Sequence, residues 1–211
     1  MQLERWTSPA GKRRSLSILD AAESGRYRRA VAIALPRPPP ASYGLTHPAG
    51  RRWYDERRAY RTAIRSAVAA ADVAIVSDVA ECYPSIGSIA IRLASRRAAG
   101  DPEPLLAFLA SAHDAGIEGL PIGPAASAAV ADAVLAIADA RAAAAGLVPI
   151  RWVDDVVFAG SRDQVARAER AWRAALHELG LRDHEGKRRR VGAPPAPSLA
   201  RACGRAIMRS S

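Results

Sequence analysis

The chain has 211 residues, 49% of them hydrophobic and 25% charged, a composition that excludes a wholly disordered chain and suffices for a domain with a buried core. Aromatic residues make up only 5%, so Ala, Val, Ile and Leu must supply most of that core. Lys and Arg number 31 against 21 Asp and Glu, which gives a formal net charge of +10 at pH 7. Nearly all of the positive charge is arginine. We interpret this bias as genomic, so the charge alone is weak evidence for a nucleic-acid partner.

Two further observations bear on where the protein acts. No apolar run reaches the ~20 residues of a membrane span, and residues 1–19 lack the apolar segment of a signal peptide. We therefore expect a cytoplasmic protein with no membrane partner. Cys82 and Cys203 are far apart in the sequence and have no Cys or His at metal-ligand spacing, so neither a zinc site nor a disulfide framework is expected.

The first third of the chain is expected to contain one strand and one helix. Residues 1–29 are polar and rich in arginine, and the run 30–35 (Ala-Val-Ala-Ile-Ala-Leu) has strand character before a proline-rich stretch that no helix could continue. Residues 53–71 place Tyr, Ala, Ile and Val at helical spacing between arginines. This pattern predicts an amphipathic helix with a cationic, solvated face.

The rest of the chain is expected to alternate between strands and helices. A strand over 73–77 leads into Asp78, and a helix could begin at Tyr83-Pro84. The later elements expected are a rigid turn at 119–124, a helix at 125–145, a hairpin of 148–153 and 156–159 with Asp154 and Asp155 at its tip, a helix at 162–179 and a basic strand at 187–191. This order predicts an α+β fold with helices on one face of an antiparallel sheet.

Three carboxylates are expected to meet at one edge of this sheet. Asp78 follows a buried strand, and Asp154 and Asp155 lie between two apolar strands, where neighbouring carboxylates repel each other and need a cation to stay ionised. Taken alone, such an acidic pair is commonly no more than a turn. Three converging carboxylates can hold two Mg²⁺ ions about 3.5 to 4 Å apart, which activates a 3′-hydroxyl and stabilises a leaving pyrophosphate.

Four segments, in this order, resemble the motifs of the reverse-transcriptase palm. They are Asp-Val-Ala-Glu-Cys-Tyr-Pro-Ser-Ile at 78–86 (motif A), Gly-Leu-Pro-Ile-Gly-Pro-Ala-Ala-Ser at 119–127 (motif B), Trp-Val-Asp-Asp at 152–155 (motif C), and Gly180-Leu181 with Lys187 (motif D). Upstream, Leu35-Pro-Arg37 and residues 45–48 are spaced like a fingers segment of the family. The resemblance covers about residues 30–191 and leans toward the small defence-associated group related to abortive-infection reverse transcriptases.

The resemblance implies a polymerase palm, that is, a ferredoxin-like antiparallel sheet with helices on one face. It implies a reduced fingers-like region at 1–72, a palm with motifs A to D at 73–191, and a basic, proline-containing tail at 192–211. Residues 188–211 are too few for a helical thumb, so no recognisable thumb is expected. A palm without a thumb is compatible with three possibilities. The protein is a distributive or template-independent polymerase, a palm completed by a partner subunit or by self-association, or a palm that has lost its catalytic activity.

The function that the resemblance implies is RNA-directed DNA synthesis, in a role in antiphage defence. Nucleotides from dNTPs would be transferred to a 3′-hydroxyl or another primer on an RNA or DNA template-primer, with two Mg²⁺ ions for which Mn²⁺ can substitute. Asp78, Asp154 and Asp155 would be the metal ligands and the catalytic acids. Lys187, one of only two lysines, would be the general acid for pyrophosphate departure, a role that an ammonium can fill and a guanidinium cannot.

The same resemblance assigns residues that bind substrate. Tyr83 would select deoxynucleotides by placing its ring where a 2′-hydroxyl would otherwise sit. Arg37 would neutralise triphosphate charge. The turn with Gly119, Pro121 and Gly123 would lie under the nascent base pair, where glycine permits close approach of the backbone.

Several positions depart from the family pattern. Tyr43 stands where a second triphosphate-binding arginine is expected, Trp152 replaces the usual tyrosine, and Asp183 and His184 replace an apolar residue and an asparagine. Together with the missing thumb, these departures support an alternative: a catalytically weak or inactive reverse-transcriptase-like subunit that binds nucleic acid. A metal-dependent nuclease or a cyclase is a third candidate, against which motif B and Tyr83 argue.

Overall fold

The computed structural model describes residues 1–7, 13–37 and 53–192, which divide into two units built from separate stretches of the chain. The described part of the first unit comprises residues 1–7, 13–37, 80–137 and 177–181. The second unit comprises residues 53–79, 138–176 and 182–192. Tyr43, the fingers-like segment at 45–48 and nearly all of the expected tail lie outside the described residues, so what the sequence predicts there stays a prediction.

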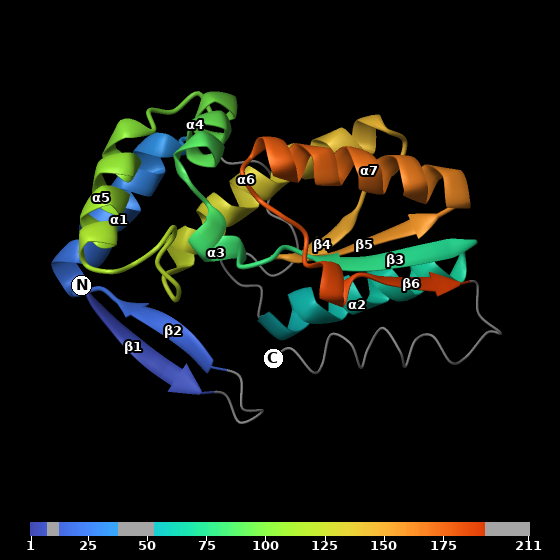
Figure 1. The fold of residues 1–211 in the computed structure, drawn as a ribbon, viewed down its shortest axis with the longest axis horizontal. Helices are drawn as coiled ribbons and strands as arrows, with labels where there is room; N and C mark the ends of the chain where they lie inside the picture. The colour runs from blue at the N-terminus through green and yellow to red at the C-terminus, as the bar shows by residue number, and fades with distance from the viewer. Residues whose placement is uncertain (8–12, 38–52, 193–211) are drawn as a thin grey trace. The chain divides into compact units, whose positions relative to one another are not determined.

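Within those residues the protein is an α+β protein with an antiparallel sheet, as expected. The sheet has four strands, and there are seven α-helices (Figure 1). The helices are α1 (Ala21–Ala34), α2 (Trp53–Ala69), α3 (Cys82–Ser85), α4 (Ser88–Arg97), α5 (Glu103–Asp114), α6 (Ala125–Ala144) and α7 (Arg162–Glu178). The strands of the four-stranded sheet are β3 (Val73–Asp78), β4 (Ile150–Trp152), β5 (Asp155–Gly160) and β6 (Arg189–Gly192). A separate hairpin is formed by β1 (Gln2–Thr7) and β2 (Arg13–Ile18).

The four-stranded sheet forms the centre of the second unit. Its strand order is β4-β5-β3-β6, and each neighbouring pair is antiparallel. In the register of the two central strands, Val73 lies opposite Gly160 and Asp78 lies opposite Asp155. Both strands are largely buried, as their nearly continuous apolar sequences predict.

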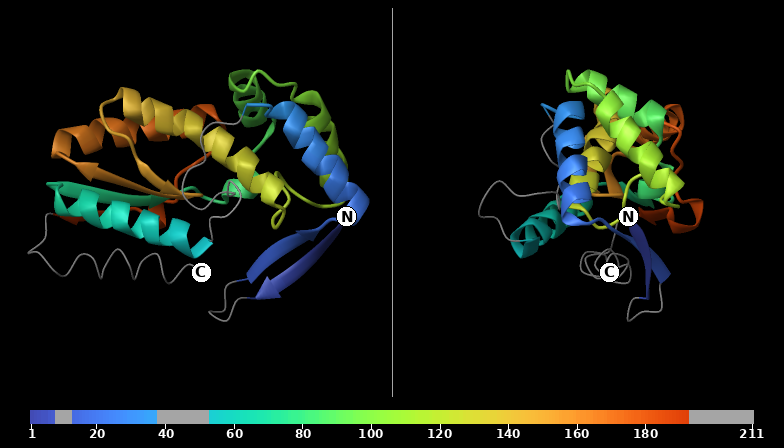
Figure 2. Two further views of the ribbon diagram at one scale, coloured as in Figure 1. Left: turned by 180° about the vertical axis from the view of Figure 1, so that it is seen from behind. Right: turned by 90° about the vertical axis from the view of Figure 1, so that its left-hand side faces the viewer.

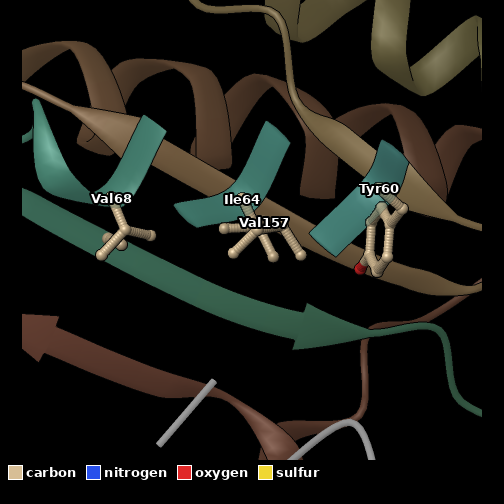
Figure 3. Packing of buried hydrophobic residues seen from close by; sticks show 5 residues of the cluster. Tyr60, Ile64, Val68 and Val157 are labelled. Atoms are coloured by element: carbon tan, nitrogen blue, oxygen red, sulfur yellow. The ribbon is translucent and has the colours of Figure 1, made fainter. Parts of the chain in front are cut away.

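Helices cover both faces of this sheet. On one face, α2 packs through an apolar cluster that consists of Tyr60, Ile64, Val68, Ala74 and Val157 (Figure 3). On the other face, Phe158 of β5 meets Trp172 of α7 edge to face, with ring centroids 5.7 Å apart. Adjacent strand residues such as Val157 and Phe158 point to opposite faces, and both views of the fold place α2 and α7 on opposite sides of the sheet (Figures 1 and 2). The expectation of helices on one face concerned the elements from residue 73 on, whereas α2 precedes them in the chain. Its place on the opposite face was not predicted, because helical periodicity identifies the apolar side of α2 but not the face that receives it.

The run 30–35 is helical, so the strand predicted there is wrong. The run lies in and just after the C-terminal half of α1. A capping box stabilises the N-terminus of this helix. In it the Asp20 carboxylate accepts a hydrogen bond from the backbone N–H of Glu23 at 2.8 Å, and the Glu23 carboxylate accepts one from the backbone N–H of Asp20 at 3.0 Å. The buried side of α1 consists of Tyr27, Ala30, Val31 and Ala34. This i, i+3, i+4, i+7 spacing becomes visible only when Tyr27 is counted with the short apolar run.

The first unit also contains elements that the sequence analysis did not predict, namely the β1–β2 hairpin, α4 and α5. Helices α1 and α5 pack together through the stacked rings of Tyr27 and Phe108, whose centroids are 4.8 Å apart. The Tyr27 hydroxyl is hydrogen-bonded to the Ser127 hydroxyl of α6 at 2.8 Å. Burial raises the pKa of Tyr27 to about 12, so this phenol remains a neutral part of the core.

The other predicted elements are confirmed with small changes at their ends. Helices α2, α6 and α7 and strand β3 match the predicted ranges to within two residues. Gly146 and Gly180 follow α6 and α7 with φ of 100° and 75°, as expected for glycines that end helices. Lys187 lies in a single 3-10 turn (Glu185–Lys187), so β6 begins later than predicted. In the part of the chain that the structure describes, no helix has the length and apolar character needed to span a membrane.

Candidate active site

Asp78 and Asp155 lie opposite each other on the two central strands of the sheet. They are partners in the antiparallel register of β3 and β5, where opposed Cβ atoms are about 4.5–5.5 Å apart. Because alternate strand residues share a face, Asp78 lies on the same face as Ala74, and Asp155 on the same face as Val157. Asp78 is only 5% exposed. Antiparallel pairing thus brings together two acids from distant segments of the chain, as predicted.

Asp154 occupies a different position from Asp155. It lies with Val153 in the turn between β4 and β5, whereas Asp155 is the first residue of β5 and the cross-strand partner of Trp152. The prediction of two acids at the hairpin tip is therefore correct only for Asp154. The carbonyl oxygen of Asp154 accepts a hydrogen bond from the backbone N–H of Val79 at 3.2 Å, which ties the turn to the residue that follows Asp78.

The pKa of the half-buried Asp155 is raised from its usual 3.8 to about 7. Burial is the largest cause, and the negative charges of Asp154 and Asp78 add to it. A side-chain hydrogen bond with Asp78 also raises this pKa, while the positive charge of Lys187 lowers it. A carboxyl pKa that neighbouring carboxylates raise in this way is typical of a binding or catalytic site.

Lys187 lies beside these carboxylates. Its Nζ donates a hydrogen bond to Oδ2 of Asp78 at 2.6 Å. Backbone pairing holds the preceding segment against the end of β3, because Asp183 forms a β-bridge with Val79 and the His184 N–H donates to the Asp78 carbonyl at 2.7 Å. The departures from the family pattern at Asp183 and His184 thus do not prevent this segment from pairing with β3.

The donor set suits a divalent cation in chemical type. Carboxylate oxygens are the hard ligands that Mg²⁺ prefers, and a cation would relieve the repulsion that raises the pKa of Asp155. Across residues 1–7, 13–37 and 53–192, however, no three or more His, Cys, Asp and Glu side chains are already gathered closely enough to hold an ion. A cation at Asp78 would therefore compete with the Lys187 ammonium and draw the carboxylates together.

The segments that resemble motifs A and B contact each other within the first unit. The N–H of Leu120 donates to the carbonyl oxygen of Tyr83 at 2.9 Å. Gly119 has φ of 59°, and a Cβ on it would lie 2.3 Å from the Tyr83 carbonyl oxygen and 2.4 Å from that of Pro84. Such approaches are not possible for a side-chain carbon, so packing against its own chain already requires glycine at this position.

The remaining predicted substrate residues also belong to the first unit. Pro121 is buried and Gly123 has φ of 124°. Their loop is held by β2, where the Ser17 N–H donates to the Ile122 carbonyl at 2.9 Å and the Ile122 N–H donates to Ser17 Oγ at 3.1 Å. Arg37 is exposed shortly after the end of α1. The roles of this loop, of Arg37 and of the partly buried Tyr83 in binding a nucleotide stay predictions.

Sequence analysis missed two arginines that contact the β4–β5 hairpin. Arg151 on β4 is 3% exposed and forms an ion pair with Asp139 of α6. Arg57 on α2 places its guanidinium carbon 5.7 Å from the centre of the Trp152 ring, a cation–π arrangement. An arginine inside the apolar run 148–153 was a usable signal, because a charged residue in a buried strand requires a partner.

In comparisons with known proteins, no family model matches the chain and no curated protein is significantly similar to it in sequence. The resemblance to the reverse-transcriptase palm consequently depends on the motifs in the sequence and stays a prediction.

Proposed function

We propose that this protein is an RNA-directed DNA polymerase of the reverse-transcriptase type, which adds deoxynucleotides to a 3′-hydroxyl or another primer. The observation that carries the proposal is the pairing of Asp78 with Asp155 in one antiparallel register. These acids come from the segments that resemble motifs A and C. Two-metal nucleotidyl transfer needs acids from separate segments to lie side by side, and this sheet brings them together.

The connectivity of the sheet supports a palm. Counted along the chain, its strands take the order second, third, first, fourth across the sheet. Helices connect the first strand to the second, and α7 connects the third to the fourth. This β-α-β-β-α-β sequence of elements is that of a ferredoxin-like unit, which is the architecture that the resemblance implies. Helix α2, on the acid-bearing face, is an addition to that unit.

The residues of the site have separate proposed roles. Asp78 and Asp155, with Asp154 in a looser contact, would hold the two Mg²⁺ ions, which when bound activate the attacking hydroxyl and neutralise the leaving pyrophosphate. Lys187 would hold a proton on Nζ, beside Asp78, for transfer to the departing pyrophosphate. The neighbouring Arg188 cannot take that role, because its guanidinium does not give up a proton.

The second candidate is a catalytically weak or inactive subunit that binds nucleic acid. The ion pair between Lys187 and Asp78 favours it, because a lysine can neutralise buried acids without any metal. The lack of a ready-made three-ligand cluster among the described residues agrees with this alternative. Such a protein would bind nucleic acid with a steep salt dependence, whether or not the acids are present.

The test is incorporation of labelled dNTPs by the purified protein with Mg²⁺ or Mn²⁺, with and without an annealed RNA template and primer. The double variant Asp154→Asn, Asp155→Asn is compared with Asp114→Asn, which changes an exposed carboxylate at the end of α5. Template-dependent product that only the double variant loses supports the polymerase. Product without template indicates terminal or protein-primed synthesis. RNA binding without product under any condition favours the second candidate.

A further inference from the structure

Arg151 is a buried charge whose contacts lead directly to the hairpin turn. Its Nε donates to Oδ2 of Asp139 at 2.7 Å, and its Nη1 donates to the carbonyl oxygen of Val153 at 2.8 Å. The side chain of Arg151 is only 2% exposed. A buried guanidinium is costly unless it is both paired and hydrogen-bonded, and here one planar group joins a helix carboxylate to the backbone of the turn.

The carboxylate of Asp139 is held from a second side. Trp172 of α7 donates from Nε1 to Oδ1 of Asp139 at 3.0 Å, so each carboxylate oxygen accepts from a different element. Trp172 is completely buried, and its ring packs on Phe158 of β5. The network therefore connects α6 and α7 to β4, and the position of the guanidinium is set by the packed interior of the second unit.

The turn that receives this hydrogen bond is strained. Val153 has φ of 53°, a left-handed conformation that is unfavourable for a β-branched residue. Such a conformation persists only where the surrounding structure imposes it, and it is typical of functional sites. The hydrogen bond from Arg151 restrains this residue, and the next two residues are Asp154 and Asp155.

We propose that Arg151 is a positioning residue that holds the Val153 turn, and thereby Asp154 and Asp155, in the geometry required for catalysis. This inference rests on the proposed function, because fixed positions for these acids matter only if they bind ions and substrate. Arginine suits the role better than lysine, since its planar fork directs separate N–H groups at the carboxylate and at the carbonyl. A displacement of about 1 Å at such a site can reduce the rate roughly 10²-fold.

The experiment uses the full chain with matched variants. Arg151→Lys keeps the charge but not the fork. Asp139→Asn replaces one of two accepting oxygens with an NH₂ group. Trp172→Phe keeps an aromatic ring but removes the Nε1 donor together with part of the buried ring, so its effect is compared with that of the other two variants. The control is Glu169→Gln, which changes another helix carboxylate of this unit, a buried one whose partner is Arg188 rather than the hairpin.

Two properties are measured at a temperature at which circular dichroism shows every variant folded. Amide hydrogen exchange is followed in peptides that cover residues 152–157, and kcat and KM for dNTP are determined with saturating Mg²⁺. In the three variants we expect exchange in the turn to rise at least ~10-fold and kcat to fall ~10- to 100-fold, with KM within about 2-fold of the wild type. Glu169→Gln should change neither the exchange nor kcat, although it should lower the melting temperature.

Unchanged exchange in the turn would overturn the proposal, and so would faster exchange with an unchanged kcat. A fall in kcat of equal size in Glu169→Gln would also overturn it, because the effect would then reflect general loss of packing. If the wild-type protein makes no product, the polymerase proposal fails. Faster exchange would then still support, and unchanged exchange would still overturn, the inference that Arg151 holds the turn.

Discussion

Replacement of Asp155 by Asn should stabilise the protein at neutral and alkaline pH. The pKa of this carboxyl is raised from 3.8 to about 7 in the folded protein, so the folded state binds the proton more tightly than the unfolded chain. Between these two pKa values the folded state holds a proton that the unfolded state has lost, and stability therefore falls as pH rises. At about 1.36 kcal/mol for each pKa unit, the ionised carboxyl costs up to about 4 kcal/mol at pH 8 and almost nothing below pH 4.

The free energy of unfolding from urea titrations at pH 5, 6, 7 and 8, without divalent cations, measures this cost. We expect the free energy of unfolding of the wild type to fall by about 2–3 kcal/mol more between pH 5 and pH 8 than that of the Asp155→Asn variant. Asp114→Asn, which changes an exposed carboxylate, should follow the wild type. If the free energy of unfolding depended on pH in the same way for the wild type and for Asp155→Asn, the conclusion that Asp155 has a raised pKa in the folded protein would be refuted.

Three further predictions concern the first unit. Gly119→Ala should lower the free energy of unfolding by at least about 2 kcal/mol, because its φ is 59° and the new Cβ would overlap the Tyr83 carbonyl. Gly25→Ala inside α1 should instead raise the free energy of unfolding by about 0.5–1 kcal/mol. Urea titrations that show equal effects for the two variants would contradict both expectations. Tyr83→Val should admit ribonucleotides, as measured by rGTP against dGTP incorporation, and unchanged sugar discrimination would exclude a selecting role. Asp20→Ala should cost about 1 kcal/mol by removing the capping box with Glu23, and a thermal melt unchanged from the wild type would show that this cap does not stabilise α1.

Local signals predicted a large part of the structure. The apolar stripe of α2, the buried run of β3 and the glycines that follow α6 and α7 each specify an element through its own residues, and these elements are found where predicted. Short runs were less informative. Residues 30–35 fit a strand or a helix equally well, because six apolar residues do not show which period they follow.

The features of the candidate site can likewise be separated into those that the sequence determines and those that the tertiary structure determines. The sequence by itself determined which residue types are present: three acids after or between apolar strands, one lysine among many arginines, and glycines at a turn. Tertiary structure alone decided that Asp78 lies opposite Asp155 rather than Asp154, that Lys187 contacts Asp78, and that a buried Arg151 supports the turn. The physical reason is that periodicity and turn chemistry act over a few residues, whereas register and buried ion pairs depend on partners far away in the chain.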